Sequence, residues 1–342
     1  MAGKPTARVA ITRRALVSTT ASSAVGAMLA TPALAGGGQQ ASPSRASGIV
    51  RRRYTATSRG VSLQLYRGCR DTPASGQAAG PVVILAHGST LSASSSFDLQ
   101  VPSGTRYSMM ESLAGRGFDV WMLDFDGYGR SGWSGGNANI DHGVEDLIAP
   151  AKVIESETGQ RRYSLYGQSS GALRVGAYAM RQPERVERLV LESFVWTGAN
   201  SPTLIERAKR VEEYQAQPRR RIDQALLDSI AARSGRARNH EVAQAIAANE
   251  LSGSGWIPSG TYLDMVTRLP LVDPARLECP TMIARGEHDE IATEEDVLGF
   301  FAKLRHPTRQ YIRFGDLGHG LAMSSLREQL WATVANFLPT PA

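Results

Sequence analysis

Arg162-Tyr163-Ser164-Leu165-Tyr166-Gly167-Gln168-Ser169-Ser170-Gly171-Ala172-Leu173 joins a strand-like run to helix-forming residues through Gly-x-Ser-x-Gly. A serine in so sharp a turn needs small residues two positions away on either side, and Gly167 and Gly171 supply them. The stretch therefore predicts a nucleophile elbow with Ser169 at its tip. The pentapeptide alone also fits an ordinary strand–helix turn, so the rest of the chain has to support this interpretation.

Apolar runs that end in polar or glycine-rich loops lie on both sides of this turn. They predict buried strands at Pro81–Ala86, Phe118–Leu123, Arg188–Ser193, Thr281–Gly286 and Gln310–Phe314. Ahead of them, Ile49–Thr57 and Val61–Arg67 alternate polar and apolar residues and are separated by Ser58-Arg59-Gly60, which predicts a hairpin.

Helical patterns lie between the predicted strands. We expect helices at Thr105–Ala114, from an Asp141 N-cap to Ile154, from the elbow to Arg181, at Glu294–Leu304 and up to Phe337. Because strand and helix alternate, right-handed crossovers give an α/β fold with a mostly parallel, doubly wound sheet of about eight strands.

Residues 195–269 interrupt this alternation. They contain three charged helical segments, Ala208–Gln217, Ile222–Ala232 and Glu241–Leu251, and no obvious strand. This pattern predicts a helical cap inserted between two parts of one core, residues 49–194 and 270–342.

The first 35 residues have the pattern of an export signal. Arg13-Arg14 precede an uncharged, mildly apolar stretch that ends Ala33-Leu34-Ala35, a small-x-small cleavage pattern. The paired arginines resemble those of a twin-arginine signal, which implies the twin-arginine export machinery as a partner. We expect cleavage, a flexible linker at 36–48, no stable membrane insertion afterwards, and a periplasmic or secreted protein. A membrane anchor is the competing interpretation, but the stretch is too short and too rich in hydroxyl residues to span comfortably.

The charge and cysteine content exclude some classes of protein. The net charge is +6, and removal of the leader with its four basic residues leaves about +2, too little to argue for a nucleic-acid partner. The runs Arg51-Arg52-Arg53 and Arg219-Arg220-Arg221 are interpreted as solvated faces. Cys69 and Cys279 are the two cysteines, so no disulfide framework holds the fold, and whether they pair is open.

Reactive side chains follow the predicted strands in the order Ser169, Asp289, His319. The chain resembles the α/β-hydrolase superfamily over roughly residues 50 to 338, apart from the cap. The resemblance rests on these blocks in order: His87-Gly88, Asp124-x-Asp126-Gly127-x-Gly129-x-Ser131, Gly167-x-Ser169-x-Gly171, Gly286-x-x-Asp289 and Gly318-His319-Gly320.

The resemblance implies roles for these residues. His319 would take the proton of Ser169, and Asp289 would orient and stabilise the imidazole. The backbone N–H groups of Ser89 and Ser170 would bind the oxyanion. Glu192, at the end of the strand after the nucleophile, is the alternative acid, because some members of the superfamily supply the acid from there.

The predicted activity is that of an exported, monomeric or weakly oligomeric serine hydrolase without cofactor or metal. It would cleave a carboxylic ester or lactone of a small to medium, fairly apolar molecule. Serine rather than aspartate at position 169 argues against a dehalogenase or an epoxide hydrolase. The alternatives are a cofactor-free haloperoxidase-like perhydrolase, a carbon–carbon bond hydrolase and a non-catalytic binding protein. The candidates for substrate binding are aromatic: Trp133, Trp196, Trp256 and Tyr262.

Overall fold

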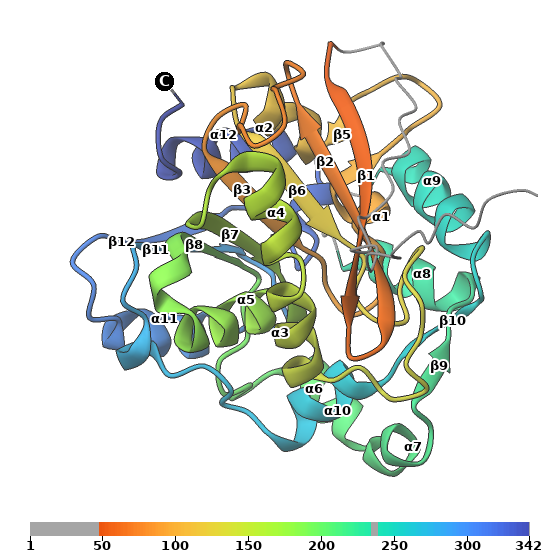
Figure 1. Cartoon of the computed structure of the whole chain (residues 1–342). Coiled ribbons are helices and arrows are strands. Elements are labelled where there is room, and N and C mark those ends of the chain that lie inside the picture. The colour runs from red at the N-terminus through yellow and green to blue at the C-terminus, as the bar shows by residue number, and fades with distance from the viewer. Residues whose placement is uncertain (1–47, 234–238, 342) are drawn as a thin grey trace, which may run out of the picture. The chain divides into compact units, whose positions relative to one another are not determined.

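A computed structural model describes residues 48–233 and 239–341 of the protein. Its centre is an eight-stranded sheet in the order β1-β2-β6-β3-β7-β8-β11-β12 (Figure 1). The strands are β1 (Val50–Ser58), β2 (Val61–Cys69), β3 (Val82–Ala86), β6 (Asp119–Leu123), β7 (Tyr163–Gln168), β8 (Val186–Glu192), β11 (Thr281–Gly286) and β12 (Arg309–Phe314). β1 and β2 form an antiparallel hairpin, and β2 is also antiparallel to its other neighbour, β6. The remaining neighbouring pairs are parallel. The expected hairpin and mostly parallel sheet are confirmed.

Both faces of the sheet are covered, because side chains of each buried strand alternate between two cores. In β3, Ile84 packs into one core and Val83 and Leu85 into the other. The first core receives side chains from α3 (Ile140–Ile148), α4 (Ala151–Thr158), α5 (Ser170–Arg181) and α11 (Glu294–Lys303). The second receives α1 (Ala93–Phe97), α2 (Met109–Gly115) and α12 (Arg327–Phe337). Figure 1 shows these helices as layers around the sheet.

Two predicted helix starts are wrong, and side-chain caps explain both. The helix expected from Thr105 begins at Met109, where the Ser108 side chain accepts a hydrogen bond from the Glu111 N–H. Just before it, β5 (Tyr107–Ser108) pairs with β4 (Asp98–Leu99). The helix expected from an Asp141 cap is capped by Asn139 instead, and Pro150, which has no N–H to donate, separates α3 from α4.

The segment between β8 and β11, where the cap is predicted and which we call the cap below, contributes no strand to the eight-stranded sheet. It contains α6 (Pro202–Ala208), α7 (Val211–Ala216), α8 (Gln224–Ala232), α9 (His240–Leu251) and α10 (Gly260–Thr267). The expectation of no strand here is wrong, because β9 (Arg219–Arg221) and β10 (Trp256–Pro258) pair antiparallel. Each strand is only three residues long, which is too short to show a periodic pattern in the sequence.

The interpretation of both arginine runs as solvated faces is wrong in part. A strand turns alternate side chains to opposite sides, so the middle residue of β9, Arg220, points inward and is buried while Arg221 is exposed. In β1, Arg51 is half-buried and pairs with Asp98 and Glu111.

The two cysteines do not pair. Cys69 and Cys279 are both buried and free. The Cys69 thiol donates to the carbonyl oxygen of Asp71 at 3.0 Å, so its surroundings on β2 satisfy it without a disulfide.

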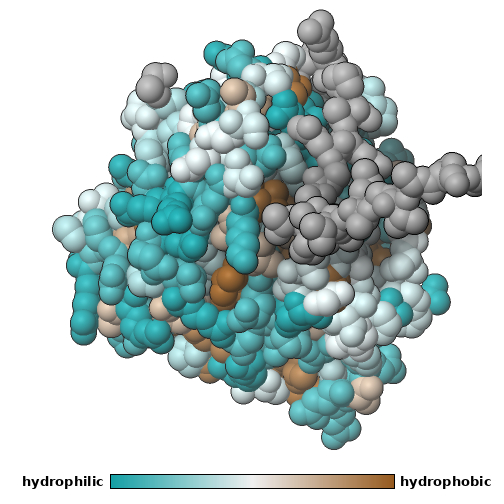
Figure 2. All heavy atoms as spheres, in the orientation of Figure 1, coloured by the Kyte–Doolittle hydropathy of each residue, from teal (hydrophilic) through white to brown (hydrophobic). Residues whose placement is uncertain are grey.

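The face drawn in Figure 2 is mostly hydrophilic, with apolar side chains in small separate areas. None of the helices between residues 48 and 341 that the structure describes is long and apolar enough to cross a membrane. The predicted leader at 1–35 and the predicted linker as far as Ser47 lie outside the described residues.

Candidate active site

Ser169 occupies a strained turn between β7 and α5. Its backbone has φ 56° and ψ −121°, a conformation that side-chain-bearing residues rarely adopt. The turn is so crowded that a Cβ on Gly167 would lie 2.5 Å from the Gly171 carbonyl oxygen. A Cβ on Gly171 would overlap the Ala86 carbonyl oxygen and lie 2.7 Å from that of His87. The two glycines are therefore needed because neighbouring backbone passes against the turn.

The structure brings Ser169, His319 and Asp289 into one chain of hydrogen bonds. His319 follows β12 and places Nε2 2.9 Å from the Ser169 Oγ. Asp289 follows β11 and places both carboxylate oxygens 2.9 Å from Nδ1 of His319. These distances suit proton transfer from the serine to the imidazole. The backbone of His319 is held on both sides, since its N–H donates to the Arg233 carbonyl oxygen and its own carbonyl oxygen accepts from the Ser193 hydroxyl.

Asp289 is buried, yet it is held as a carboxylate. Burial alone would raise its pKa, but the charge of His319 and its hydrogen bond outweigh that effect. The N–H groups of Ile291 and Ala292 each donate to Oδ1 at 2.9 Å and lower the pKa further. The net result is a pKa below the ordinary aspartate value, so Asp289 can stabilise a charged imidazole.

Glu192, the alternative acid, lies at the end of β8 and makes different contacts. Its carboxylate accepts from the Tyr166 hydroxyl and, at 3.4 Å, from the Gln168 amide. Burial raises the pKa of Glu192 to about 7 in spite of these hydrogen bonds. Within the described part of the chain no hydrogen bond joins Glu192 to His319, so Asp289 is the carboxylate that the imidazole contacts.

The two predicted oxyanion donors flank Ser169. Ser170 begins α5, and Ser89 follows Gly88, where an added Cβ would lie 3.3 Å from the Ser169 Cβ. Among residues 48–233 and 239–341, neither the Ser89 nor the Ser170 N–H donates a hydrogen bond. Both amides therefore remain available to a ligand oxygen.

His87 holds the loop that carries Ser89. Its Nδ1 bonds the Gly88 carbonyl oxygen at 2.8 Å, and its Nε2 accepts from the Phe125 N–H at 3.2 Å. Burial and the nearby charge of Arg174 lower the pKa of His87 to about 3, so the ring is neutral near pH 7. This arrangement fits a structural role.

The family model described as serine aminopeptidase, S33 matches residues 102–324, more than half of the chain. The chain belongs to this family of α/β hydrolases. No curated protein matches it.

Solved structures share the fold of this α/β hydrolase at low sequence identity. An esterase from Thermogutta terrifontis superposes with a TM-score of 0.61 at 22% identity, over 83% of this chain and 97% of the esterase. An enol-lactonase from Burkholderia xenovorans LB400 gives 0.61 at 18%, over 83% and 98%. A hydrolase from Pseudomonas aeruginosa PA01 gives 0.63 at 18%, over 83% and 97%. At these identities the likeness establishes the fold.

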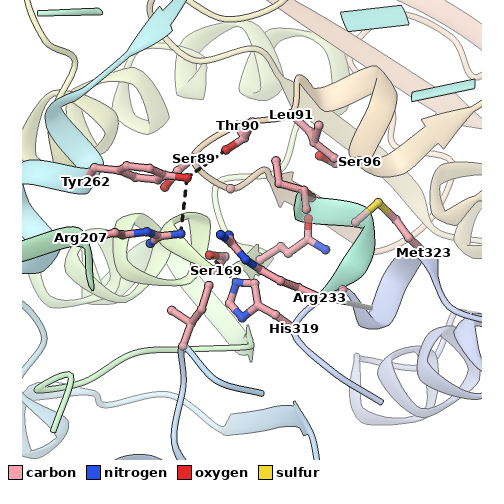
Figure 3. Close-up of a pocket in the computed structure, with 15 residues that line it drawn as sticks. Ser89, Thr90, Leu91, Ser96, Ser169, Arg207, Arg233, Tyr262, His319 and Met323 are labelled. Atoms are coloured by element: carbon pink, nitrogen blue, oxygen red, sulfur yellow. Dashed lines mark hydrogen bonds between the residues drawn. The ribbon is translucent and has the colours of Figure 1, made fainter. Parts of the chain in front are cut away.

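A cavity of about 70 Å³ opens beside Ser169 in this hydrolase (Figure 3). One part of its wall is apolar and consists of Leu91, Ile230, Ile291 and Met323. The remaining lining residues are Gly88, Ser89, Thr90, Ser96, Gln168, Ser169, Arg207, Arg233, Tyr262, His319 and Gly320. No Asp or Glu occurs among these lining residues, so the charges that face the cavity are positive.

The cap supplies the positive charges. Arg207 of α6 and Arg233, just after α8, extend into the cavity, and Tyr262 of α10 lies beside them (Figure 3). A guanidinium nitrogen of Arg207 lies 3.4 Å from the Tyr262 hydroxyl, which is also 3.4 Å from the Thr90 hydroxyl. Burial would raise the pKa of Tyr262, but the charges of Arg207 and then Arg220 outweigh it and lower the pKa to about 6.

Arg220 connects the cap to the loop that carries Ser89. Its guanidinium donates to the carbonyl oxygens of Ser89 and Pro258 and lies 3.8 Å from the centre of the Tyr262 ring. The Ser89 carbonyl oxygen also accepts from the Tyr128 hydroxyl at 2.9 Å. Two donors thus hold the Ser89–Thr90 peptide, which directly follows the Gly88–Ser89 peptide whose N–H is the predicted oxyanion donor.

Of the four aromatic candidates for substrate binding, Tyr262 alone lines the cavity beside Ser169. Trp133 and Trp256 line a separate cavity of about 320 Å³, where Arg219 lies 3.6 Å over the Trp133 ring. Trp196 packs on Phe300 and donates from Nε1 to the Val272 carbonyl oxygen. These three tryptophans therefore lie outside the cavity beside Ser169.

Arg207 and Arg233 are not among the residues predicted from the sequence. Arg207 lies three residues after Leu204 on α6, and both are buried, so an arginine occupies the apolar stripe of this helix. That spacing was a usable indication. Arg233 offers no comparable pattern, because it comes after the end of α8.

Proposed function

We propose that the protein is a serine hydrolase that cleaves a carboxylic ester or lactone through an acyl-enzyme on Ser169. The observation that carries this proposal is the unbroken contact from Ser169 Oγ through His319 to the Asp289 carboxylate, next to two unengaged backbone N–H groups. A serine hydroxyl becomes a useful nucleophile when a positioned base takes its proton.

In the proposed reaction, Ser169 Oγ attacks the carbonyl carbon while its proton passes to Nε2 of His319. The carbonyl oxygen becomes an oxyanion, and the Ser89 and Ser170 N–H groups stabilise it. When the intermediate collapses, the bond to the leaving oxygen breaks and His319 returns the proton to that oxygen. A water molecule then repeats the sequence and releases the acid. With a lactone, the leaving alcohol stays attached to the acyl group.

The charge of the cavity supports an ester or lactone over the N-terminus of a peptide. An α-ammonium group is a cation near neutral pH, and a site for it needs a carboxylate. The cavity lining contains no Asp or Glu, and Arg207 and Arg233 would repel the ammonium. The apolar wall at Leu91, Ile230, Ile291 and Met323 supports a substrate with an apolar portion of limited size.

Hydrolysis of p-nitrophenyl esters of increasing acyl length, together with lactones, tests the proposal. We expect turnover of short acyl esters, covalent labelling by a fluorophosphonate at Ser169, and loss of both in Ser169→Ala. Ser156→Ala, on the exposed side of α4, is the matched control and should behave as wild type. Undiminished hydrolysis in Ser169→Ala would refute the proposed mechanism.

We also propose that the protein is exported through the twin-arginine pathway to the periplasm or the medium. The motif Arg13-Arg14 and the Ala33-Leu34-Ala35 cleavage pattern support this. We expect the mature protein to begin near Gly36 and to accumulate outside the cytoplasm. Replacing both Arg13 and Arg14 with Lys should retain it inside, whereas Arg8→Lys should not. Export of the double variant at the wild-type level would argue against this pathway.

A further inference from the structure

Arg207 and Arg233 enter the cavity without an acidic partner. Arg207 is only 9% exposed, and its recorded hydrogen bond is to the neutral or anionic oxygen of Tyr262. In the part of the chain that the structure describes, neither arginine has a carboxylate oxygen within 4.0 Å. The remaining residues, 1–47, 234–238 and 342, include no Asp or Glu, so they offer no side-chain carboxylate either.

Three other buried arginines of this protein have partners of other kinds: a carboxylate, backbone carbonyl oxygens or an aromatic ring. Arg67 is almost fully buried and binds Asp119 at 2.6 Å. Arg220 donates to two backbone carbonyl oxygens. Arg174 has no acidic partner, but it stacks 3.9 Å over the Phe125 ring and does not line the cavity. Arg207 likewise stacks 4.0 Å from the centre of the Tyr262 ring, but it differs from these three arginines in lining the cavity beside Ser169.

An unpaired buried charge destabilises a fold, because desolvation is not offset by a partner. The Tyr262 phenolate could serve as a counter-ion within the site, but it carries one negative charge. The guanidinium groups of Arg207, Arg220 and Arg233 together carry three positive charges. The site therefore keeps a surplus of positive charge opposite Ser169. A ligand anion would remove it, and a planar guanidinium fits a carboxylate through two parallel hydrogen bonds.

We propose that the substrate carries a carboxylate, which Arg207 and Arg233 bind while its ester or lactone carbonyl lies at Ser169. This inference rests on the proposed function and adds the class of substrate: a half-ester of a dicarboxylic acid, or a lactone of a hydroxy-dicarboxylic acid with its second carboxylate free. Arg207, Arg233 and Ser169 line the same small cavity, which favours a short connection between the two groups, and the apolar wall would cover that connection.

Matched esters test the inference. Mono-4-nitrophenyl adipate and 4-nitrophenyl hexanoate have acyl groups of equal carbon number and differ in the terminal carboxylate. We expect wild type to have the higher kcat/KM for the adipate ester. In Arg207→Met the ratio of the adipate value to the hexanoate value should fall about 10- to 100-fold, the range for loss of a charge-assisted hydrogen bond. The 5-phosphonopentanoate ester tests the anion type, and turnover above that of the adipate ester would overturn the carboxylate assignment.

Arg210→Met is the control variant, because Arg210 belongs to the same cap but is exposed and pairs with Glu213. It should leave both esters unaffected. Arg207→Met should also retain or raise the melting temperature, because the wild-type charge is unpaired. Equal losses for both esters, or a wild-type preference for hexanoate, would overturn the inference.

Binding without turnover separates this inference from the proposed function. Calorimetry with adipate and the Ser169→Ala protein should detect binding, which Ser169→Ala combined with Arg207→Met should lose. Hexanoate turnover that depends on Ser169, without adipate binding, would overturn the inference alone. If neither ester is turned over but adipate still binds, the proposed hydrolysis fails and the anion site stands.

Discussion

Glu192 is the last residue of β8 and Asp289 follows the neighbouring strand β11, and their hydrogen bonds differ. Asp289 contacts His319 through both oxygens, whereas Glu192 is engaged by Tyr166 and Gln168. We predict that Asp289→Asn lowers kcat about 10⁴-fold, because the amide favours the wrong imidazole tautomer. Glu192→Gln should retain most of the activity. Steady-state kinetics on one p-nitrophenyl ester decides between them, and the reverse pattern would make Glu192 the acid.

Tyr262 should titrate far below the other tyrosines with a perturbed pKa. Its pKa is lowered to about 6, whereas those of Tyr54, Tyr66, Tyr163, Tyr166, Tyr178, Tyr214 and Tyr311 are raised. Raising the pH through 6 should therefore produce phenolate absorbance equivalent to one tyrosine. Tyr262→Phe should abolish this step. Arg207→Met should move it to higher pH, because it removes the largest lowering effect. An absorbance unchanged below pH 8 would contradict the prediction.

Among individual residues, the sequence predicted the catalytic candidates that follow strands, because the carboxyl ends of parallel strands meet at one edge of a sheet. Ser169, Asp289 and His319 are such residues, and the structure brings them into contact. Arg207 could not be placed in the same way. The spacing from Leu204 indicates that Arg207 lies on the buried side of α6, but that it faces Ser169 depends on contacts distant in sequence.

The passage from β7 to α5 depends on Gly171. A methyl group there would overlap the Ala86 carbonyl oxygen, so Gly171→Ala should destabilise the protein by several kcal/mol and displace Ser169. Gly115, at the end of α2, has open space around it and is the matched control. Gly115→Ala should stabilise by about 0.5–1 kcal/mol. Urea denaturation measures both variants, and equal effects would contradict the crowding argument.

Strands were easier to predict than helix ends or the cap. A buried strand such as β11 is marked by consecutive apolar residues, here Met282 to Ala284, and its predicted bounds, Thr281–Gly286, agree with the structure. Helix starts depend on a single capping side chain, and Asn139 and Asp141 are both good caps by type. The β9–β10 pair is held by contacts distant in sequence, including the Arg220 hydrogen bonds to Pro258 and Ser89. Contacts of this kind produce no periodic pattern of apolar residues in the sequence.

For the whole molecule, Glu192 links stability to pH. Its pKa rises from 4.5 to about 7 on folding, so the folded protein holds a proton that the unfolded chain releases. Its contribution to stability is complete below pH 4.5 and is lost as the pH rises through 7. Relative to wild type, Glu192→Gln should thus gain roughly 3 kcal/mol of unfolding free energy between pH 4 and 8. Urea denaturation across this range measures the difference, and a constant difference would contradict it.

The fold of the whole chain followed from the alternation of strands and helices, whereas the charge of the cavity did not. That charge arises where the cap residues Arg207 and Arg233 face the sheet residues that carry Ser169. Composition cannot reveal it, because the net charge of the protein says nothing about which charges lack partners.

Arg220 also limits how freely the cap can be exchanged. The cap is one continuous segment between β8 and β11, so recombination could replace it and change substrate preference without touching Ser169, His319 or Asp289. A foreign cap would also remove the guanidinium that holds the Ser89 carbonyl oxygen. The Tyr128 hydroxyl of the core would remain as one donor, so a chimera must bring a second donor to restore the native contacts of that carbonyl, which makes this hydrogen bond a compatibility requirement between two otherwise modular parts.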